Sequence, residues 1–213
     1  MTHPQNLLEY EDKAKASGFR FVFGVDEAGR GPLAGPVVAA AVLLKEANFK
    51  NRIADSKKLS PLQRERAFVE IHERAWVGVG IVGEGVIDEI NILRAAHRAM
   101  AEAVNNLVDH LPEEVKTEKG FSRSVRVLID GNSFTGQLPY DIQTIVKGDA
   151  KSFSVAAASI IAKVTRDRII DDFDALYPQY GFKAHKGYPT EAHRLAIHKY
   201  GLSPIHRKTF RVK

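Results

Sequence analysis

The stretch from residue 37 to residue 44 constrains the fold more than any other part of the chain. It reads Val-Val-Ala-Ala-Ala-Val-Leu-Leu, with Gly35-Pro36 before it and Lys45-Glu46 after it. An unbroken apolar run of this length, bounded by turn residues and by charges, predicts a buried strand. The core is therefore expected to form around a sheet.

Hydrophobic periodicity predicts the remaining elements. Further strands are expected over residues 19–26, 76–82, 125–130 and 142–146. Helices are expected over residues 6–17, 60–74, 153–176 and 190–200. Apolar positions spaced by three and four from Ile87 to Leu107 predict one amphipathic helix, and the polar stretch 111–124 predicts a loop. Early strands with helices between and after them favour an α/β fold, a mixed five-stranded sheet flanked by helices.

The composition limits the classes of protein to which the chain can belong. With 213 residues it is expected to form a single domain, residues 1–213, with a buried core. The absence of cysteine excludes disulfide frameworks, zinc knuckles and cysteine nucleophiles. No apolar run approaches the roughly 20 residues that span a membrane, so a cytoplasmic location is expected. The net charge of +5 is compatible with a phosphate polymer as partner, and equally with a mildly basic soluble enzyme.

Acidic residues stand at the ends of three strand-like segments. They are Asp26-Glu27, Asp130 and Asp149. Ligand sites of α/β sheets form at strand ends, and carboxylates gathered there resist full ionisation. Mg²⁺ or Mn²⁺ would relieve that repulsion, and two ions about 4 Å apart could support hydrolysis of a phosphodiester. Taken singly, Asp130 or Asp149 could equally be a turn residue or a helix cap.

The adjacent pair Asp26-Glu27 adds a geometric condition. Neighbouring residues of a strand point to opposite faces of the sheet. Both carboxylates can therefore serve one site only if the backbone bends or if the site lies at the end of the sheet.

The segment from Gly29 to Ala34 also fits the G-x-G-x-x-A pattern of dinucleotide-binding folds, and Asp55 follows about 20 positions later as that pattern requires. That pattern must open a helix. Here Gly35-Pro36 interrupts it and a strand follows, so we reject this interpretation. Gly29 and Gly31 instead allow the backbone to approach a ligand closely, and Arg30 could bind a phosphate or a sugar hydroxyl.

Eight blocks of this sequence together resemble bacterial ribonuclease HII, the type 2 ribonuclease H family. They follow the family's order over nearly the whole chain: Gly24-Val-Asp-Glu-Ala-Gly-Arg-Gly-Pro-Leu-Ala-Gly-Pro36, Asp55-Ser-Lys-Lys-Leu59, Leu128-Ile-Asp-Gly-Asn132, Lys147-Gly-Asp149, Ala157-Ala-Ser-Ile-Ile-Ala-Lys-Val-Thr-Arg-Asp167, Tyr177-Pro178, His185-Lys-Gly-Tyr188 and Pro204-Ile-His-Arg207. No single block would carry the resemblance, but their number and order do.

The resemblance implies a ribonuclease H-like fold with a small C-terminal helical segment over residues 177–213. It implies four acidic metal ligands, which fall on Asp26, Glu27, Asp130 and Asp149. The family's glycine-arginine-glycine motif falls on Gly29, Arg30 and Gly31 and would read the ribose 2′-hydroxyl. The family's junction-sensing tyrosine falls on Tyr188 and would stack on the deoxyribose that follows the ribonucleotide. From the residues alone, Tyr188 could equally be a partly buried surface tyrosine. The 2′-hydroxyl is the sugar group that distinguishes RNA from DNA.

The activity implied by the resemblance is endonucleolytic cleavage of the RNA strand of RNA–DNA hybrids. It includes cutting 5′ of ribonucleotides embedded in duplex DNA, by two-metal-ion catalysis with Mg²⁺ or Mn²⁺, to leave 3′-hydroxyl and 5′-phosphate ends. Its biological task would be removal of embedded ribonucleotides and RNA primers. The chain ends six residues after Arg207, so no clamp-binding tail is expected. Nothing in the sequence demands an oligomer, and a monomer is expected.

Several other polar residues are candidate phosphate contacts. Ser159 and Lys163 are four positions apart on a predicted helix and therefore share a face. The further candidates are Lys57, Lys147 and Arg166. Each lysine could equally be a solvated surface charge. Asp167 is expected to pair with a nearby arginine.

Four histidines raise the question of a metal site. They are His185, His193, His198 and His206. Their spacing fits no zinc motif, so surface or phosphate-facing positions are expected for them.

Two rival functions remain at this stage. One is another nuclease of the same fold, such as a resolvase or transposase core, against which the Gly-Arg-Gly and Lys-Gly-Tyr blocks argue. The other is a non-catalytic module that binds hybrids. The four acidic residues argue against it, because clustered negative charge does not help a protein to bind phosphate.

Overall fold

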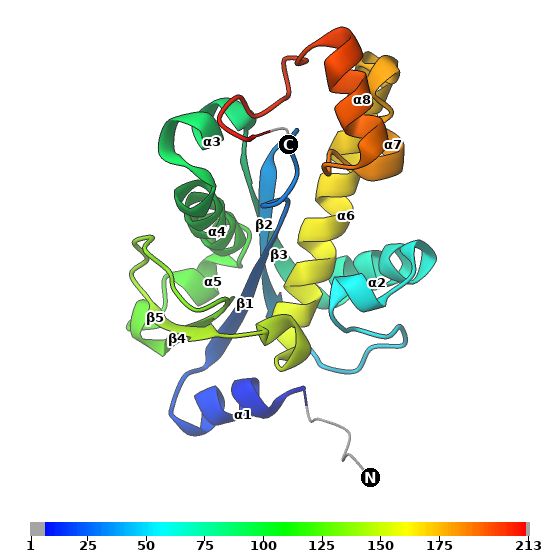
Figure 1. Cartoon of the computed structure of the whole chain (residues 1–213). Coiled ribbons are helices and arrows are strands. Elements are labelled where there is room, and N and C mark those ends of the chain that lie inside the picture. The colour runs from blue at the N-terminus through cyan, green and yellow to red at the C-terminus, as the bar shows by residue number, and fades with distance from the viewer. Residues whose placement is uncertain (1–6, 212–213) are drawn as a thin grey trace.

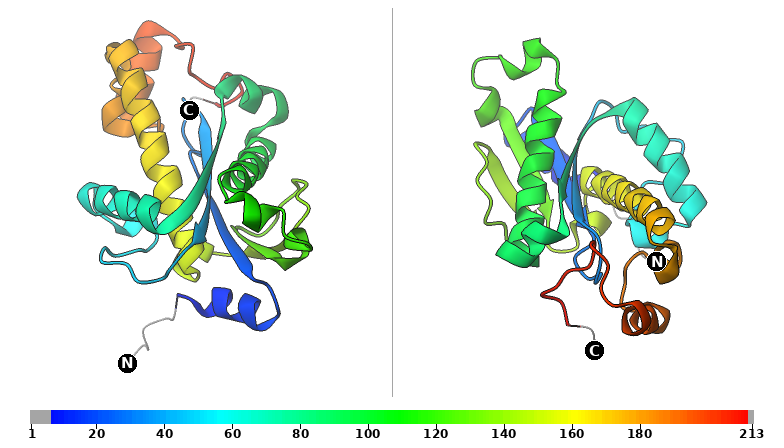
Figure 2. Two further views of the ribbon diagram at one scale, coloured as in Figure 1. Left: turned by 180° about the vertical axis from the view of Figure 1, so that it is seen from behind. Right: turned by 90° about the horizontal axis from the view of Figure 1, so that it is seen from above.

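The computed structural model describes residues 7–211 and consists of a five-stranded mixed sheet between two layers of helices (Figures 1 and 2). The strand order is β3-β2-β1-β4-β5. The strands are β1 (Phe21–Ala28), β2 (Val37–Leu44), β3 (Ala75–Val82), β4 (Val125–Asp130) and β5 (Asp141–Ile145). The pairs β1–β2 and β2–β3 are antiparallel, whereas β1–β4 and β4–β5 are parallel. The predicted mixed sheet of five strands is confirmed.

Helices cover both faces of this sheet. On one face lie α3 (Glu84–Ile90), α4 (Ile92–Asp109) and α5 (Glu113–Lys116), and on the other α2 (Pro61–Arg74) and α6 (Phe153–Leu176), as Figure 2 shows from above. Helix α1 (Glu9–Ala16) lies at the end of the sheet where β1 begins, whereas α7 (Phe182–His185) and α8 (Glu191–Tyr200) lie beyond the far end of α6 (Figure 1). No helix within residues 7–211 combines the length and apolar character needed to cross a membrane.

The burial of β2 explains its unbroken apolar run. Val37, Ala39 and Ala41 pack in the core layer that contains α4, whereas Ala40 and Val42 pack in the layer that contains α6 and α2. Because successive side chains of a strand point to opposite faces, a strand covered on both sides needs apolar residues at every position.

At three strand glycines, Gly24, Gly78 and Gly80, a helix lies closer to the sheet than a side chain would allow. A Cβ atom at Gly80 would lie 2.0 Å from the carbonyl oxygen of Ala99 in α4. A Cβ atom at Gly24 in β1 would lie 2.2 Å from the carbonyl carbon of Ser154 in α6. Glycine at position 24 therefore lets the first turn of α6 lie directly on β1, close to Asp26.

Most predicted elements are confirmed within one or two residues. Helix α2 begins with the predicted Ser60 cap, whose side chain accepts a hydrogen bond from the backbone of Gln63, and α8 begins with the predicted Thr190 cap. The predicted first helix began at Asn6, which lies outside the described residues; its described part is α1.

Three local predictions are corrected. The helix predicted from Ile87 to Leu107 is two helices, because Asn91 has a φ of 68° and its side chain caps α4 by accepting from the backbone of Leu93 and Arg94. The polar stretch predicted as a loop contains α5 and a 3-10 turn at Phe121–Ser124. Helix α7 was not predicted; at four residues it is too short to show a period.

The last residues run back from α8 towards α3 (Figure 1). There the carboxylate of Asp88 accepts hydrogen bonds from the backbone of Lys208 and from the backbone and hydroxyl of Thr209. The segment before them adds a bridge between Ala34 and His206. The C-terminal residues thereby fix the loop that joins β1 to β2.

Candidate active site

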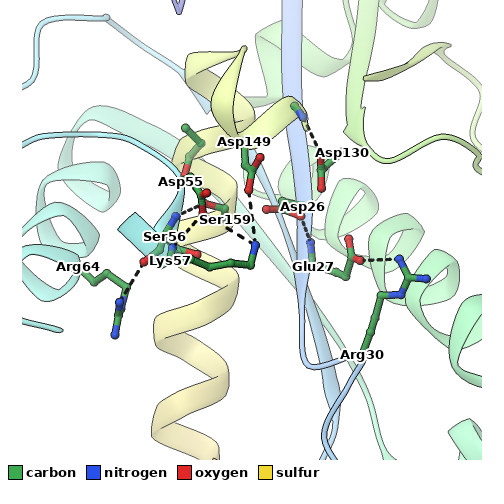
Figure 3. A network of polar contacts seen from close by, with 12 residues as sticks. Asp26, Glu27, Arg30, Asp55, Ser56, Lys57, Arg64, Asp130, Asp149 and Ser159 are labelled. Atoms are coloured by element: carbon green, nitrogen blue, oxygen red, sulfur yellow. Dashed lines mark hydrogen bonds and ion pairs between the residues drawn. The ribbon is translucent and has the colours of Figure 1, made fainter. Parts of the chain in front are cut away.

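Two neighbouring parallel strands bring the first acidic residues together. Val25 of β1 pairs with Ile129 of β4, so Asp26 and Asp130 follow at the same edge of the sheet. Asp149 lies in the 3-10 turn Gly148–Ala150, immediately before α6. Figure 3 shows the side chains of Asp26, Asp130 and Asp149 directed towards one another, with Glu27 beside them. Asp26 is 4% exposed and Asp149 is 7% exposed.

The electrostatics of this cluster are unfavourable as it stands. Burial, and next the charges of Glu27 and Asp130, raise the pKa of Asp26 well above its ordinary value. Burial also raises the pKa values of Asp130 and Asp149, the latter with a further contribution from Asp55. A divalent cation removes this conflict, because it compensates the negative charges where water is excluded.

The chemistry of the donors fits a hard cation. All four candidate ligands offer carboxylate oxygens, which Mg²⁺ and Mn²⁺ prefer. The Oε2 atom of Glu27 is buried and has no hydrogen-bond partner within the described residues. An orphaned carboxylate oxygen in this place could serve as a ligand atom for such an ion.

The carboxylates also have partners that an ion would replace. Asp26 accepts from the backbone of Glu27 at 2.7 Å, and Asp130 accepts from the backbone of Gly148 at 2.6 Å. Asp149 lies 3.6 Å from the ammonium group of Lys57. In this arrangement no three acidic or histidine side chains of residues 7–211 surround one point closely enough to hold an ion. To hold an ion, these side chains would have to rotate and Lys57 would have to leave Asp149.

The glycine-arginine-glycine segment follows these carboxylates directly. Gly29 has a φ of 101°, and the loop continues through Gly35-Pro36 into β2 rather than into a helix. This confirms that the dinucleotide interpretation is excluded. The guanidinium of Arg30 is half exposed and lies 3.2 Å from Oε1 of Glu27. The loop therefore presents Arg30 at the edge of the acidic cluster.

Two buried arginines fix this loop through its backbone carbonyl groups. Arg207 donates to the carbonyl oxygens of four loop residues: Gly29, Arg30, Pro32 and Gly35. Arg166 donates to three more carbonyl oxygens, those of Ala34, Pro36 and Lys186. Both side chains are about 1% exposed. The predicted phosphate contact of Arg166 is therefore corrected: its guanidinium is buried and donates to backbone carbonyl groups, so it shapes the loop instead.

Tyr188 lies beside Gly31 of the same loop. A Cβ atom at Gly31 would be 3.5 Å from a ring carbon of Tyr188, and the tyrosine is 42% exposed. A cleft of about 380 Å³ contains this ring together with the Gly-Arg-Gly loop and part of the acidic cluster. Its lining is Asp26, Glu27, Ala28, Gly29, Arg30, Gly31, Ser56, Lys57, Asp130, Lys163 and Tyr188.

The other predicted phosphate contacts have different surroundings. Lys57 and Lys163 line the cleft, and Lys163 forms an ion pair with Asp167 at 2.7 Å, which replaces the arginine partner predicted for Asp167. Lys147 is exposed, with a φ of 58°, and is not part of this lining. Ser159 is buried: it accepts from the backbone of Ser56 and donates to the carbonyl of Ala156, so its prediction is corrected.

Two of the four histidines are also corrected. His193 and His206 are buried, at 0% and 2% exposed, and lie neither on the surface nor in the cleft lining. Arg207 was not among the predicted site residues. Its role depends on hydrogen bonds to backbone carbonyl groups, and hydrophobic spacing in a sequence gives no signal for such bonds.

The comparisons with known proteins agree with this geometry. The family model for ribonuclease HII matches residues 23–213. Ribonuclease HII of Ruminiclostridium cellulolyticum is 51% identical over 211 residues, which are 99% of this chain and 77% of that protein. Ribonuclease HII of Geobacter sulfurreducens is 50% identical over 206 residues, which are 96% of this chain and 88% of that protein.

Solved structures show the same fold. The structure of the PCNA:RNase HII complex from Archaeoglobus fulgidus matches with a TM-score of 0.70 and 25% identity, over 91% of this chain and 96% of that one. A ribonuclease HIII solved in complex with Mn²⁺ matches with a TM-score of 0.68 and 18% identity, over 93% of this chain and 70% of that one, and supports the fold alone. The chain thus has the ribonuclease H-like fold and belongs to the ribonuclease HII family, endoribonucleases that act on the RNA of RNA–DNA hybrids.

Proposed function

We propose that this enzyme cuts on the 5′ side of ribonucleotides embedded in duplex DNA, as well as within the RNA strand of hybrids, and leaves 3′-hydroxyl and 5′-phosphate ends. One observation carries the proposal: a single cleft is lined by Asp26, Glu27 and Asp130 of the acidic cluster and also by the loop and tyrosine suited to a ribose. A nuclease that did not distinguish the sugar would have no need of such groups beside its carboxylates.

Asp26, Glu27, Asp130 and Asp149 would hold two divalent ions. Mg²⁺ or Mn²⁺ bound there supplies positive charge for the phosphate and lowers the pKa of water. The Mn²⁺ reported for the ribonuclease HIII neighbour is consistent with this choice of ion. No side chain of the cleft is required as a covalent nucleophile.

The remaining residues of the cleft bind and orient the substrate. Backbone amides of Gly29 and Gly31 and the guanidinium of Arg30 can form hydrogen bonds with a 2′-hydroxyl. A site built for these bonds rejects deoxyribose, because its own polar groups would then be unpaired. The exposed ring of Tyr188 can lie flat on the next sugar, and Lys57 and Lys163 can contact neighbouring phosphates.

A duplex of DNA with one ribonucleotide tests the proposal. With Mg²⁺ or Mn²⁺ we expect a single cut, 5′ of the ribonucleotide, and no cut in the matched all-DNA duplex. Binding without cleavage would favour a non-catalytic module, and equal cleavage of both duplexes would favour a resolvase-like nuclease.

The variant Asp26→Asn tests the assignment of the acidic cluster in the same assay. It should lose cleavage by at least roughly a thousandfold, because the Asn side chain is a poor ligand for a hard cation. Its circular dichroism spectrum should match that of the wild type. Full activity of a folded Asp26→Asn protein would contradict the assignment.

A further inference from the structure

A chain of hydrogen bonds between buried histidines ends on the backbone of Tyr188. His193 in α8 has its Nδ1 atom 2.9 Å from the carbonyl oxygen of Tyr188. Its Nε2 atom lies 3.0 Å from Nε2 of His206, and Nδ1 of His206 lies 2.8 Å from the backbone nitrogen of Ser203. Both imidazole rings also pack against the buried ring of Phe182, but their nitrogen atoms have polar partners.

The direction of each hydrogen bond follows from its partner. A backbone N–H can only donate, so Nδ1 of His206 accepts from Ser203 and its proton is on Nε2. A carbonyl oxygen can only accept, so Nδ1 of His193 carries a proton and donates to Tyr188. The Nε2–H group of His206 then donates to the free lone pair of Nε2 in His193. Both rings are neutral, in agreement with the burial that lowers both their pKa values.

A third histidine supports the same segment. His185 accepts from the backbone of Gly187 and donates to the carbonyl of Tyr180. Its ring stacks on that of His193, with 4.3 Å between the ring centres and 15° between the planes. The ring of His193 is therefore fixed in its plane as well as at both of its nitrogens.

The residue next to His206 fixes the other recognition element. Arg207 donates to four carbonyl groups of the Gly29–Gly35 loop, as described above, and its backbone donates to the carbonyl of Leu33. Two consecutive residues near the C-terminus thus hold both elements: His206 reaches Tyr188 through His193, and Arg207 reaches the Gly-Arg-Gly loop directly.

We propose that His193, held by His206, is a positioning residue that sets where Tyr188 stands relative to the ribose-reading loop, and thereby sets the preference for a deoxyribose after the ribonucleotide. The inference rests on the proposed function of Tyr188. His193 touches no substrate; it acts through the carbonyl group of the tyrosine.

Two substitutions at position 193 test separately the hydrogen bond to Tyr188 and the hydrogen bond to His206. The amide nitrogen of Asn and the Nδ1 atom of His are both bonded to Cγ. His193→Asn therefore keeps a donor for the carbonyl of Tyr188 but loses the contact with His206. In Gln the amide reaches the position of Nε2, so His193→Gln keeps the contact with His206 and loses the donor. His198→Gln, at an exposed position of the same helix, is the matched control.

The readout is a ratio of two kcat/KM values, one on duplex DNA with a single ribonucleotide and one on a hybrid whose RNA strand contains only ribonucleotides. Loss of folded protein lowers both values equally and leaves the ratio unchanged. We expect His193→Gln to lower the ratio roughly fivefold, the equivalent of one lost hydrogen bond. We expect His193→Asn, which keeps the donor but loses the contact with His206, to lower the ratio less than His193→Gln does, and we expect His198→Gln to keep the wild-type ratio.

Tyr188→Ala, alone and combined with His193→Gln, gives a double-mutant cycle. It should lower the ratio by itself, and adding His193→Gln to it should lower the ratio no further, since the histidine acts through the tyrosine. An unchanged ratio in His193→Gln, or an equal decrease with and without Tyr188, would overturn the positioning role while the proposed function stands. A wild-type ratio in Tyr188→Ala would overturn the proposed role of the tyrosine and this inference with it.

Discussion

Asp26 is the single residue whose environment is most costly without metal. It is buried at the end of β1, and the charges of Glu27, Asp130 and Asp149 all raise its pKa. Its side chain accepts a hydrogen bond from the backbone N–H group of Glu27, and an asparagine carbonyl can accept that bond equally well. Its charge therefore opposes folding of the metal-free protein, and the proposed ion would compensate it.

Asp26→Asn should consequently stabilise the protein in EDTA. Removing one buried charge from the cluster is expected to raise the melting temperature by a few degrees, since about 1 kcal/mol corresponds to roughly 2–4 °C in a chain of this size. Added Mg²⁺ should raise the melting temperature of the wild type more than that of the variant. Asp172→Asn, at an exposed position in α6, is the control. A lower melting temperature of Asp26→Asn in EDTA would show that the carboxylates do not repel one another.

Arg207 is the second residue with a testable role. Burial, and next the charge of Arg166, lower the pKa of its guanidinium to about 9, so it remains charged at neutral pH. Arg207→Lys keeps the charge but cannot reach four carbonyl groups at once. We expect a loss of about 2–3 kcal/mol in the free energy of unfolding, measured with urea, because buried carbonyls lose a charged donor. Lys208→Ala, at an exposed position, should change it by less than about 0.5 kcal/mol.

The sequence allowed some of the site residues to be predicted, but not all of them. Asp26, Asp130 and Asp149 could be singled out because each follows an apolar strand, and the structure brings them together. The phosphate contacts of Arg166 and Ser159 could not be judged, because sequence spacing identifies a shared helix face but not whether solvent reaches it. Their burial depends on the β1–β2 loop and on the Ser56 turn, which contact them from distant parts of the chain.

The position of helix α6 decides where Asp149 lies. The carboxylate of Glu11 in α1 is buried and accepts from the hydroxyl of Ser152 and from the backbone and hydroxyl of Ser154, at the first turn of α6. A negative charge at this end of a helix also interacts favourably with the helix dipole. Helix α1 therefore anchors the turn that carries Asp149, although it precedes the part of the chain matched by the family model.

Glu11→Ala should therefore weaken both folding and metal binding. We expect about 2 kcal/mol less stability, because the N–H and hydroxyl groups at the start of α6 lose their acceptor in a buried place. The affinity for Mn²⁺, measured by calorimetry, should fall as Asp149 loses its fixed position. Glu9→Ala, at an exposed position of the same helix, should leave the Mn²⁺ affinity unchanged. Wild-type affinity in a destabilised Glu11→Ala protein would limit Glu11 to a role in folding.

Element boundaries were predictable where a residue type has a strong local preference. Ser60 and Thr190 begin their helices as predicted, and β2 was recognisable from its apolar run alone. The break at Asn91 was not predictable from spacing, because the apolar positions continue in phase across it. Asn91 has a left-handed backbone conformation, which asparagine adopts more readily than most residues. An asparagine in the sequence does not by itself predict this conformation, because most asparagines do not adopt it.

The buried histidines make the free energy of unfolding of the whole protein depend on pH. Burial, and next the charge of His193, lower the pKa of His206 to about 4, and burial lowers that of His193. In the unfolded chain both would titrate near the ordinary value of 6.5. Below that pH the unfolded state binds more protons than the folded state, so the free energy of unfolding falls as the pH decreases from about 6.5 towards 4. The carboxylates of the acidic cluster act in the opposite direction, because their pKa values are raised.

His206→Gln removes one of the titrating rings and should flatten this decrease. At pH 5 the wild type is expected to lose up to about 2 kcal/mol through His206, since each pH unit below the unfolded pKa costs about 1.4 kcal/mol. Urea unfolding of both proteins between pH 7.5 and pH 4.5, without divalent ions, measures the two slopes. Part of the slope should persist in the variant, because burial also lowers the pKa values of His72 and His97. His198→Gln should keep the wild-type slope, and an equal slope in His206→Gln would mean that His206 already accepts a proton in the folded protein.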